Sequence, residues 1–107
     1  MKRYGSVIRV KPEKLEEYKR LHADVWEDVK RKIKEVHIEN YSIYYKENYL
    51  FSYYEYTGND YEGDMKKMAM DERTKEWWKL TDPCQKPVES ANPGEWWSVM
   101  EEVFHLD

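Results

Sequence analysis

The 107-residue sequence predicts an α+β fold with the element order βαββαβ, which is the split βαβ plan of ferredoxin-like proteins. Two observations carry this prediction. Runs that are typical of β-strands occur at both ends of the chain and twice in its middle. In these runs apolar and polar residues alternate, or tyrosine is frequent. Apolar residues at helical spacing fill the two intervals between these strands. Helices should therefore cover one face of an antiparallel sheet and leave the other face open.

The first half of the chain supplies a strand, a helix and a hairpin. Residues 2–10 show the period of two that is typical of a half-buried strand. Pro12 fits the first turn of a helix, and apolar residues at helical spacing as far as Ile33 predict one long amphipathic helix. Two runs rich in tyrosine, 38–45 and 49–56, are separated by three residues and should pair as an antiparallel hairpin.

The second half supplies helices, a loop and a closing strand. Asp60 can cap a helix over 61–70, and a second helical piece follows over 71–80. Residues 83–94 contain three prolines and little periodicity, so we expect a surface loop there. The pattern of residues 96–106 predicts the last strand of the sheet.

Length, charge and cysteine content restrict the classes of function. No repeat or linker divides the chain, so residues 1–107 should form a single domain. The net charge of -4 argues against a nucleic-acid partner. No apolar run approaches the ~20 residues that cross a membrane, and no apolar signal segment opens the chain, so we expect a cytoplasmic protein. Cys84 is the single cysteine, and no spacing of cysteine or histidine suggests a metal site.

The candidate catalytic residue is His22, on the helical face that also carries Tyr18. The two side chains are one turn apart and should be neighbours. A histidine that points inward can transfer protons near neutral pH, and the alternative interpretation is a packed histidine with no chemical role.

Three further aromatic residues can complete a binding site for a sugar. Tyr41 lies on the second predicted strand and can reach the same cavity from the sheet. Trp77 and Trp78 project about 100° apart on their helix, so one can anchor the core while the other borders a cavity. A Trp ring under the apolar face of a pyranose, with Tyr and His groups around its hydroxyl rim, would form such a site. Packing alone is the other explanation of each ring.

The open face of the sheet should carry several Tyr and Trp side chains. A face this apolar is usually covered by a second copy of the same sheet. We therefore expect a homodimer with twofold symmetry.

Four segments of the chain resemble the L-rhamnose mutarotase family in order and spacing. They are Tyr18-x-x-x-His22-x-x-Val25-Trp26, Asn40-Tyr41-Ser42-Ile43, Trp77-Trp78 and Glu101-Glu102-Val103-Phe104-His105-Leu106. The resemblance covers nearly the whole chain. It implies a dimeric α+β barrel that interconverts the α and β anomers of L-rhamnose by opening and closing the sugar ring. It also implies a proton donor at His22, substrate contacts at Tyr18, Tyr41, Trp77 and Trp78, and no cofactor or metal.

Two departures from the family pattern leave alternatives open. Residues 27–29 and the loop 83–97 differ from the family's usual sequence, so L-fucose or another 6-deoxyhexose is an alternative substrate. A dimeric α+β barrel that binds haem or a quinol-like aromatic and works as a monooxygenase, with His22 as iron ligand or base, is a rival from another class. A sugar sensor that binds without catalysis is a third possibility.

Overall fold

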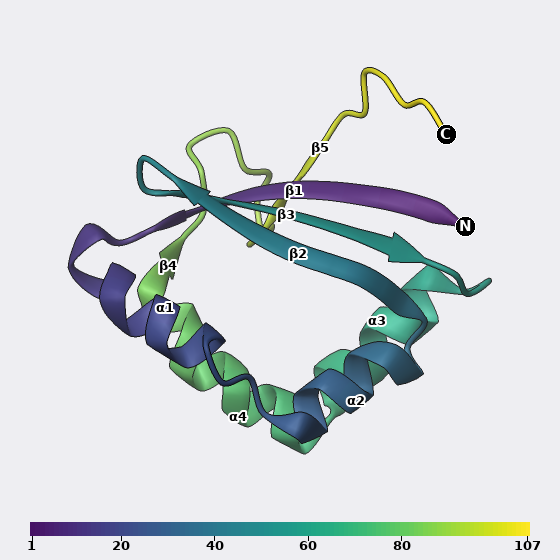
Figure 1. Ribbon diagram of the computed structural model, residues 1–107, viewed down its shortest axis with the longest axis horizontal. Coiled ribbons are helices and arrows are strands. Elements are labelled where there is room, and N and C mark those ends of the chain that lie inside the picture. The colour runs from purple at the N-terminus through teal and green to yellow at the C-terminus, as the bar shows by residue number, and fades with distance from the viewer.

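The computed structural model describes residues 1–107, which form a curled sheet with helices on one face (Figure 1). The elements in chain order are β1 (Lys2–Val10), η1 (Pro12–Lys14), α1 (Leu15–His22), α2 (Glu27–Glu35), β2 (Ile38–Lys46), β3 (Tyr49–Tyr56), α3 (Tyr61–Met70), α4 (Glu72–Thr81), η2 (Asp82–Cys84), β4 (Gln85–Lys86) and β5 (Ser98–Met100). None of the helices has the length and apolar character needed to cross a membrane.

The sheet is antiparallel with the strand order β2-β3-β1-β4, and β5 pairs with β1 as well. β3 runs along one edge of β1 from the pair Lys2 and Tyr56 to the pair Arg9 and Tyr49. β4 pairs with the end of β1 and β5 with its middle, so together they occupy its other edge. This order is that of the ferredoxin-like plan, and the predicted fold class is confirmed.

The predicted hairpin of β2 and β3 is confirmed, with a tight turn at its tip. Glu47 and Asn48 have φ angles of 50° and 69°. Positive φ at two successive residues matches the right-handed twist of the flanking strands, and asparagine adopts it readily. The pairing shifts between Glu39 and Ser42, where Asn40 also has a positive φ of 50°. This irregularity lies directly beside Tyr41.

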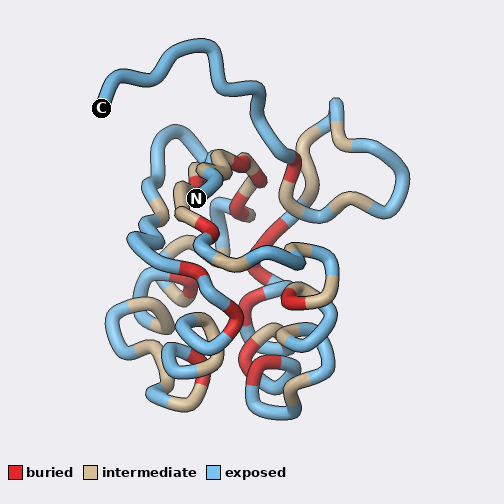
Figure 2. Tube along the Cα trace, turned by 90° about the vertical axis from the view of Figure 1, so that its right-hand side faces the viewer, coloured by how far each residue is buried: buried red, intermediate tan, exposed pale blue.

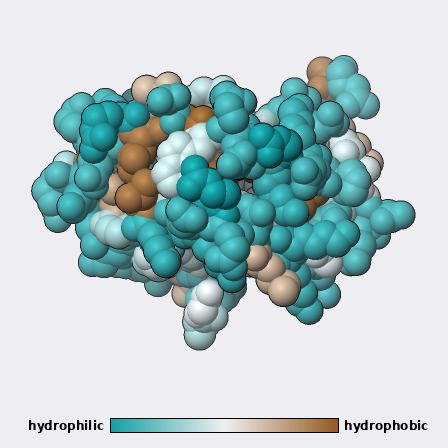
Figure 3. All heavy atoms as spheres, turned by 90° about the horizontal axis from the view of Figure 1, so that it is seen from below, coloured by the Kyte–Doolittle hydropathy of each residue, from teal (hydrophilic) through white to brown (hydrophobic).

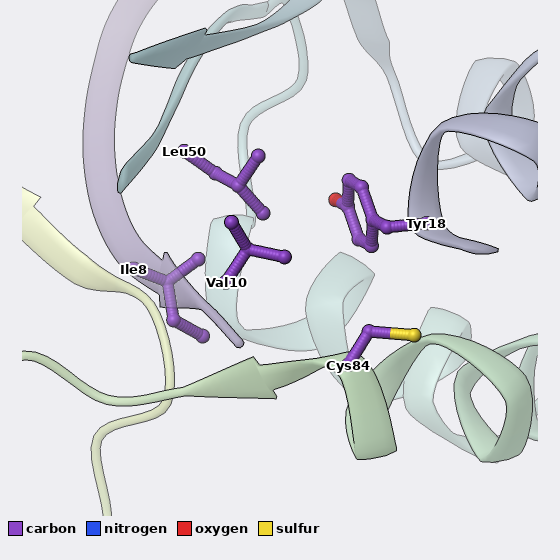
Figure 4. Close-up of a cluster of buried hydrophobic side chains, with 5 residues drawn as sticks. All are labelled: Ile8, Val10, Tyr18, Leu50 and Cys84. Carbon is purple, nitrogen blue, oxygen red and sulfur yellow. The ribbon is translucent and has the colours of Figure 1, made fainter. Parts of the chain in front are cut away.

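The core forms between the sheet and the helices. Ile8 and Val10 of β1 and Leu50 of β3 are at most 2 % exposed, as the predicted alternation of residues 2–10 requires. They form one cluster with Tyr18 of α1 and Cys84 of η2 (Figure 4). Burying each aliphatic side chain contributes about 1.5–3 kcal/mol. Buried residues therefore line the interior, whereas the C-terminal segment is exposed (Figure 2).

The prediction of one long helix is wrong, because the chain leaves the helical path at residues 23–26. The amide of Ala23 still bonds to the last turn of α1, but Trp26 is extended, with ψ 138°, and starts α2. The Trp26 ring packs edge-on against Trp77 with centroids 5.3 Å apart, and the Arg73 guanidinium lies 4.2 Å from its centroid. These tertiary contacts compensate for the missing turn, and the helical spacing does not report them.

Both predicted helices of the second half are confirmed, each beginning at an aspartate. The Asp60 carboxylate accepts a hydrogen bond from the Gly63 amide at 3.1 Å, and Asp71 accepts one from the Thr74 amide at 3.0 Å. Each bond satisfies an amide that has no partner inside the helix.

The last third of the chain departs from the prediction in two places. The expected loop 83–94 contains β4, because Gln85 and Lys86 find free backbone groups at the end of β1. The predicted strand 96–106 pairs only over Ser98–Met100. Residues 101–107 are exposed and extend beyond Met100, the last residue that pairs with β1 (Figure 1).

Candidate active site

Helix α1 brings Tyr18 and His22 into direct contact. Their rings stack with centroids 4.1 Å apart and an interplanar angle of 27°. The His22 Nδ1 atom lies 2.9 Å from the backbone carbonyl of Tyr18. A carbonyl only accepts, so this contact assigns the proton to Nδ1 and leaves Nε2 with a free lone pair.

The surroundings of His22 favour its neutral form. Burial lowers the pKa of His22, and the hydrogen bond to the Tyr18 carbonyl opposes this effect only in part. The imidazole is therefore neutral near pH 7, and Nε2 is available to accept a proton.

Trp77 of α4 completes a three-ring cluster around His22. It is 5 % exposed, and its ring meets the His22 ring edge-on with centroids 5.4 Å apart. Three of the five predicted site residues, Tyr18, His22 and Trp77, are thus in contact. Trp78 follows on the same helix, is half-buried, and makes no ring contact with this cluster.

Tyr41 approaches from the sheet and belongs to a second group of tyrosines. Its ring packs edge-on against Tyr54 with centroids 5.3 Å apart, and the Tyr54 and Tyr61 hydroxyl groups share a hydrogen bond. The residue is 40 % exposed, yet burial of its hydroxyl raises the pKa of Tyr41 to about 12. Burial, followed by the nearby Tyr41, raises the pKa of Tyr18 as well. Both phenols therefore remain protonated donors at physiological pH.

A cavity of about 260 Å³ opens beside Tyr18 and His22. The other residues that line it come from α1, its C-terminal end and the β2–β3 hairpin: Leu15, Lys19, Ala23, Ile43, Tyr44, Tyr45 and Leu50. From the helical side, an apolar area ringed by hydrophilic residues is visible at the left (Figure 3), which is the end of the molecule that carries α1. Tyr41, Trp77 and Trp78 do not line this cavity.

Two residues near Tyr18 were not recognised from the sequence. Gln85 of β4 is 5 % exposed, and its Nε2 atom donates to the Tyr18 hydroxyl oxygen at 3.3 Å. The Gln85 Oε1 atom accepts from Trp96 Nε1 at 2.9 Å. Gln85 lies in the segment predicted as a loop, and no periodicity or motif marks it, so nothing in the sequence could have revealed its contact with Tyr18.

The ionisable groups near the site do not gather into a metal-binding set. No three His, Cys, Asp or Glu side chains lie close enough to hold a metal ion. The Cys84 thiol is buried and directed at a Glu17 carboxylate oxygen 3.4 Å away. Burial and this carboxylate raise the pKa of Cys84 to about 11, so the thiol remains protonated.

The fold and the site define a class of small α+β protein in which a neutral histidine is held among aromatic rings at the mouth of a cavity. The family model described as L-rhamnose mutarotase matches residues 3–106. The chain belongs to the L-rhamnose mutarotase family, and its enzyme class is that of the isomerases.

Relatives and a solved structure agree with this assignment. The chain is 35% identical over 109 residues to the L-rhamnose mutarotase of Bacillus subtilis and 33% identical over 109 residues to that of Oceanobacillus iheyensis, with all of each chain covered. The crystal structure of an L-rhamnose mutarotase from Formosa agariphila superposes with a TM-score of 0.77 at 23% identity, covering 100% of both chains. At this identity the structural likeness supports the fold.

Proposed function

We propose that this protein interconverts the α and β anomers of L-rhamnose and that His22 exchanges a proton with the sugar. The observation that carries the proposal is the fixed orientation of His22. Its Nδ1 atom is bonded to the Tyr18 carbonyl at 2.9 Å, its ring lies between Tyr18 and Trp77, and the pair Tyr18 and His22 borders a cavity.

The chemistry of anomer exchange needs a proton acceptor and a proton donor in turn. His22 Nε2 accepts the proton of the anomeric hydroxyl while the ring oxygen takes a proton from a water molecule, and the bond from C1 to the ring oxygen breaks. The resulting aldehyde rotates about the C1–C2 bond. The imidazolium then returns its proton to the new anomeric hydroxyl as the ring closes and the ring oxygen loses its proton to water. No net proton is consumed, and His22 acts as proton donor in the closing step.

The same proposal gives the aromatic residues the role of substrate contacts. Tyr18 and Tyr41 donate hydrogen bonds to sugar hydroxyl or ring oxygens, which their protonated phenols support. Trp77 also holds the His22 ring in place. Tyr41, Trp77 and Trp78 do not line the cavity of the single chain, so their contacts with the sugar are proposed from the family resemblance, with the indole faces meeting the apolar side of the sugar. L-fucose and other 6-deoxyhexoses present similar apolar and hydroxyl surfaces and are the alternative substrates.

The direct test is anomer exchange followed by NMR saturation transfer. Purified protein is added to L-rhamnose and, in parallel, to L-fucose, L-mannose and D-glucose. Acceleration with L-rhamnose above the other three supports the proposal. Faster exchange of L-fucose than of L-rhamnose would reassign the substrate, and no acceleration of any sugar would overturn the proposed activity.

We further propose that the functional unit is a single-domain protein that works as a cytoplasmic homodimer. The sheet face away from the helices carries exposed apolar side chains, with Tyr44 66 %, Tyr49 42 % and Met100 39 % exposed. Phe104 and Leu106 in the C-terminal segment are 78 % and 79 % exposed. A second copy of the chain is the natural occupant of this face, because a twofold interface joins identical patches and buries both at once.

A further inference from the structure

The hydrogen bonds around Gln85 have a fixed direction. An indole Nε1 only donates, so the atom that faces Trp96 at 2.9 Å must be the amide oxygen of Gln85. This contact settles the orientation of the amide group, which is otherwise ambiguous. The Gln85 Nε2 atom consequently faces the Tyr18 hydroxyl oxygen at 3.3 Å and donates to it.

The Tyr18 hydroxyl therefore accepts from Gln85 and keeps its own proton for another partner. No protein acceptor lies within hydrogen-bond distance of this hydroxyl group; Gln85 is its single partner. Tyr18 is 4 % exposed, and a buried hydroxyl normally donates as well as accepts. Tyr18 also borders the cavity beside His22. The Tyr18 hydroxyl group can therefore donate its proton in a hydrogen bond to an oxygen atom of a molecule bound in that cavity.

We propose that Gln85 is a positioning residue that, held by Trp96, turns the Tyr18 hydroxyl proton toward a sugar oxygen next to His22. The inference rests on the proposed function, because the acceptor it names is the bound sugar. We refer to the two successive hydrogen bonds, from Trp96 to Gln85 and from Gln85 to Tyr18, as the hydrogen-bond relay. Its role is to preset Tyr18 as a donor before the substrate arrives.

This arrangement explains why a strand of two residues is built into an otherwise irregular segment. Pairing of β4 with the end of β1 holds Gln85 beneath α1, where the side chain reaches Tyr18. Arg9 of β1 secures the residue that follows β4 by donating to the Pro87 carbonyl at 2.6 Å and 2.9 Å. A preset donor avoids the entropy cost of orienting the hydroxyl during binding.

A double-mutant cycle tests the relay. Gln85→Glu leaves only acceptor atoms, so Tyr18 donates to residue 85 and no longer to the sugar. We expect this variant to lower kcat/KM for L-rhamnose about tenfold, and Gln85→Met to lower it about threefold, as expected for one buried hydrogen bond. In a Tyr18→Phe background either change should cost less than twofold, because the group through which Gln85 acts is already gone. Equal losses in both backgrounds would overturn the proposal and indicate a structural role.

Two further variants separate the relay from damage to the loop. Trp96→Phe removes the donor that orients Gln85 and should lower kcat/KM by a few fold, again only when Tyr18 is present. Glu95→Ala is the control, since the Glu95 carboxylate accepts from the Asn92 amide of the loop and from the Ser98 hydroxyl of β5 and makes no hydrogen bond to the relay residues. It should leave kcat/KM within twofold of the wild type. A tenfold loss with Glu95→Ala would point to general loosening of the loop and overturn the proposal.

The failure of the relay and the failure of the proposed function have different signatures. If the wild type accelerates anomer exchange but the losses in the double-mutant cycle are additive, the proposed function stands and the relay is refuted. If the wild type accelerates no exchange, the proposed activity fails, and the cycle is measured on the Kd of L-rhamnose by calorimetry. If the effects of the Gln85 and Tyr18 substitutions on this Kd are coupled, the relay contributes to sugar binding. If L-rhamnose does not bind, both the relay and the proposed function are overturned.

Discussion

His22 donates from Nδ1 to the carbonyl of Tyr18, the residue one turn earlier, and stacks on the ring of the same residue. One neighbour thus fixes both the tautomer and the tilt of the imidazole. The arrangement leaves the Nε2 lone pair of His22 without a partner in the protein.

The pH dependence of catalysis should follow the neutral form of His22. Burial lowers the pKa of His22 from 6.5. Log(kcat/KM) for L-rhamnose should therefore be flat above about pH 6.5 and fall only at lower pH, with an apparent pKa below that value. A rise in kcat/KM as the pH falls toward 6 would contradict a proton-accepting His22. The same lowered pKa means that any stability gained from burying neutral His22 is present above pH 6.5 and lost as pH falls through the folded pKa.

The two tryptophans of α4 should differ in their contributions to stability. Trp77 is 5 % exposed and contacts both His22 and Trp26, so Trp77→Ala should lower the free energy of unfolding by about 3–5 kcal/mol. Trp78 is half-buried, so Trp78→Ala should cost about 1–2 kcal/mol and chiefly raise KM for the sugar. Urea unfolding and anomer-exchange kinetics measure the two effects. Equal destabilisation by both variants would refute this division.

A buried aspartate in helix α3, Asp64, should make stability depend on pH in the acid range. Asp64 accepts hydrogen bonds from Tyr56 at 2.5 Å and His37 at 3.0 Å, and these bonds hold the pKa of Asp64 below its usual 3.8. Their stabilising effect is present above pH 3.8 and is lost as pH falls through the folded pKa. Asp64→Asn should lower Tm at pH 7, and its difference from the wild type should shrink below pH 3.8.

The control for Asp64 is Glu62→Gln, which removes an exposed carboxylate from the first turn of the same helix. It should leave Tm nearly unchanged across the pH range. A Tm difference between Asp64→Asn and the wild type that stays constant down to pH 2 would contradict the assigned role of the carboxylate.

The C-terminal segment should matter for assembly rather than for folding of the single chain. Phe104→Asp combined with Leu106→Asp places two charges on side chains that are almost fully exposed in one copy. Sedimentation velocity should show a dimer for the wild type and a monomer for this variant, with Ser90→Asp in an exposed loop as the control. A wild-type monomer at micromolar concentration would refute the proposed homodimer.

Local patterns in the sequence predicted most of the fold. The period of two in β1, the tyrosine-rich hairpin and the cap at Asp60 each act over a few residues, and each prediction was confirmed. The capping bond of Asp71 was not predicted, although the helix that follows it was. The break before α2 was not predictable in this way, because Trp26 is held by Arg73 and Trp77 from a helix that follows much later in the chain. Long-range contacts of this kind leave no periodic signal.

The same distinction applies to the candidate site. The spacing of four residues places Tyr18 and His22 together in any α-helix, and the structure has them stacked. Gln85 is separated from Tyr18 by 67 positions and reaches it through a strand of two residues. A strand that short has too few residues to show alternation, so Gln85 could be identified as the partner of the Tyr18 hydroxyl only from the structure.

The most direct test of the central claim is the rate of α to β exchange of L-rhamnose, measured by NMR saturation transfer with wild-type protein, His22→Ala and His105→Ala. His105 lies in the exposed C-terminal segment, bonded only to Asp107, and serves as the matched histidine control. We predict that wild-type and His105→Ala proteins accelerate exchange equally and that His22→Ala loses about 10²- to 10⁴-fold while remaining folded. Near-wild-type exchange by a folded His22→Ala protein would contradict the assignment of His22 as the group that transfers the proton.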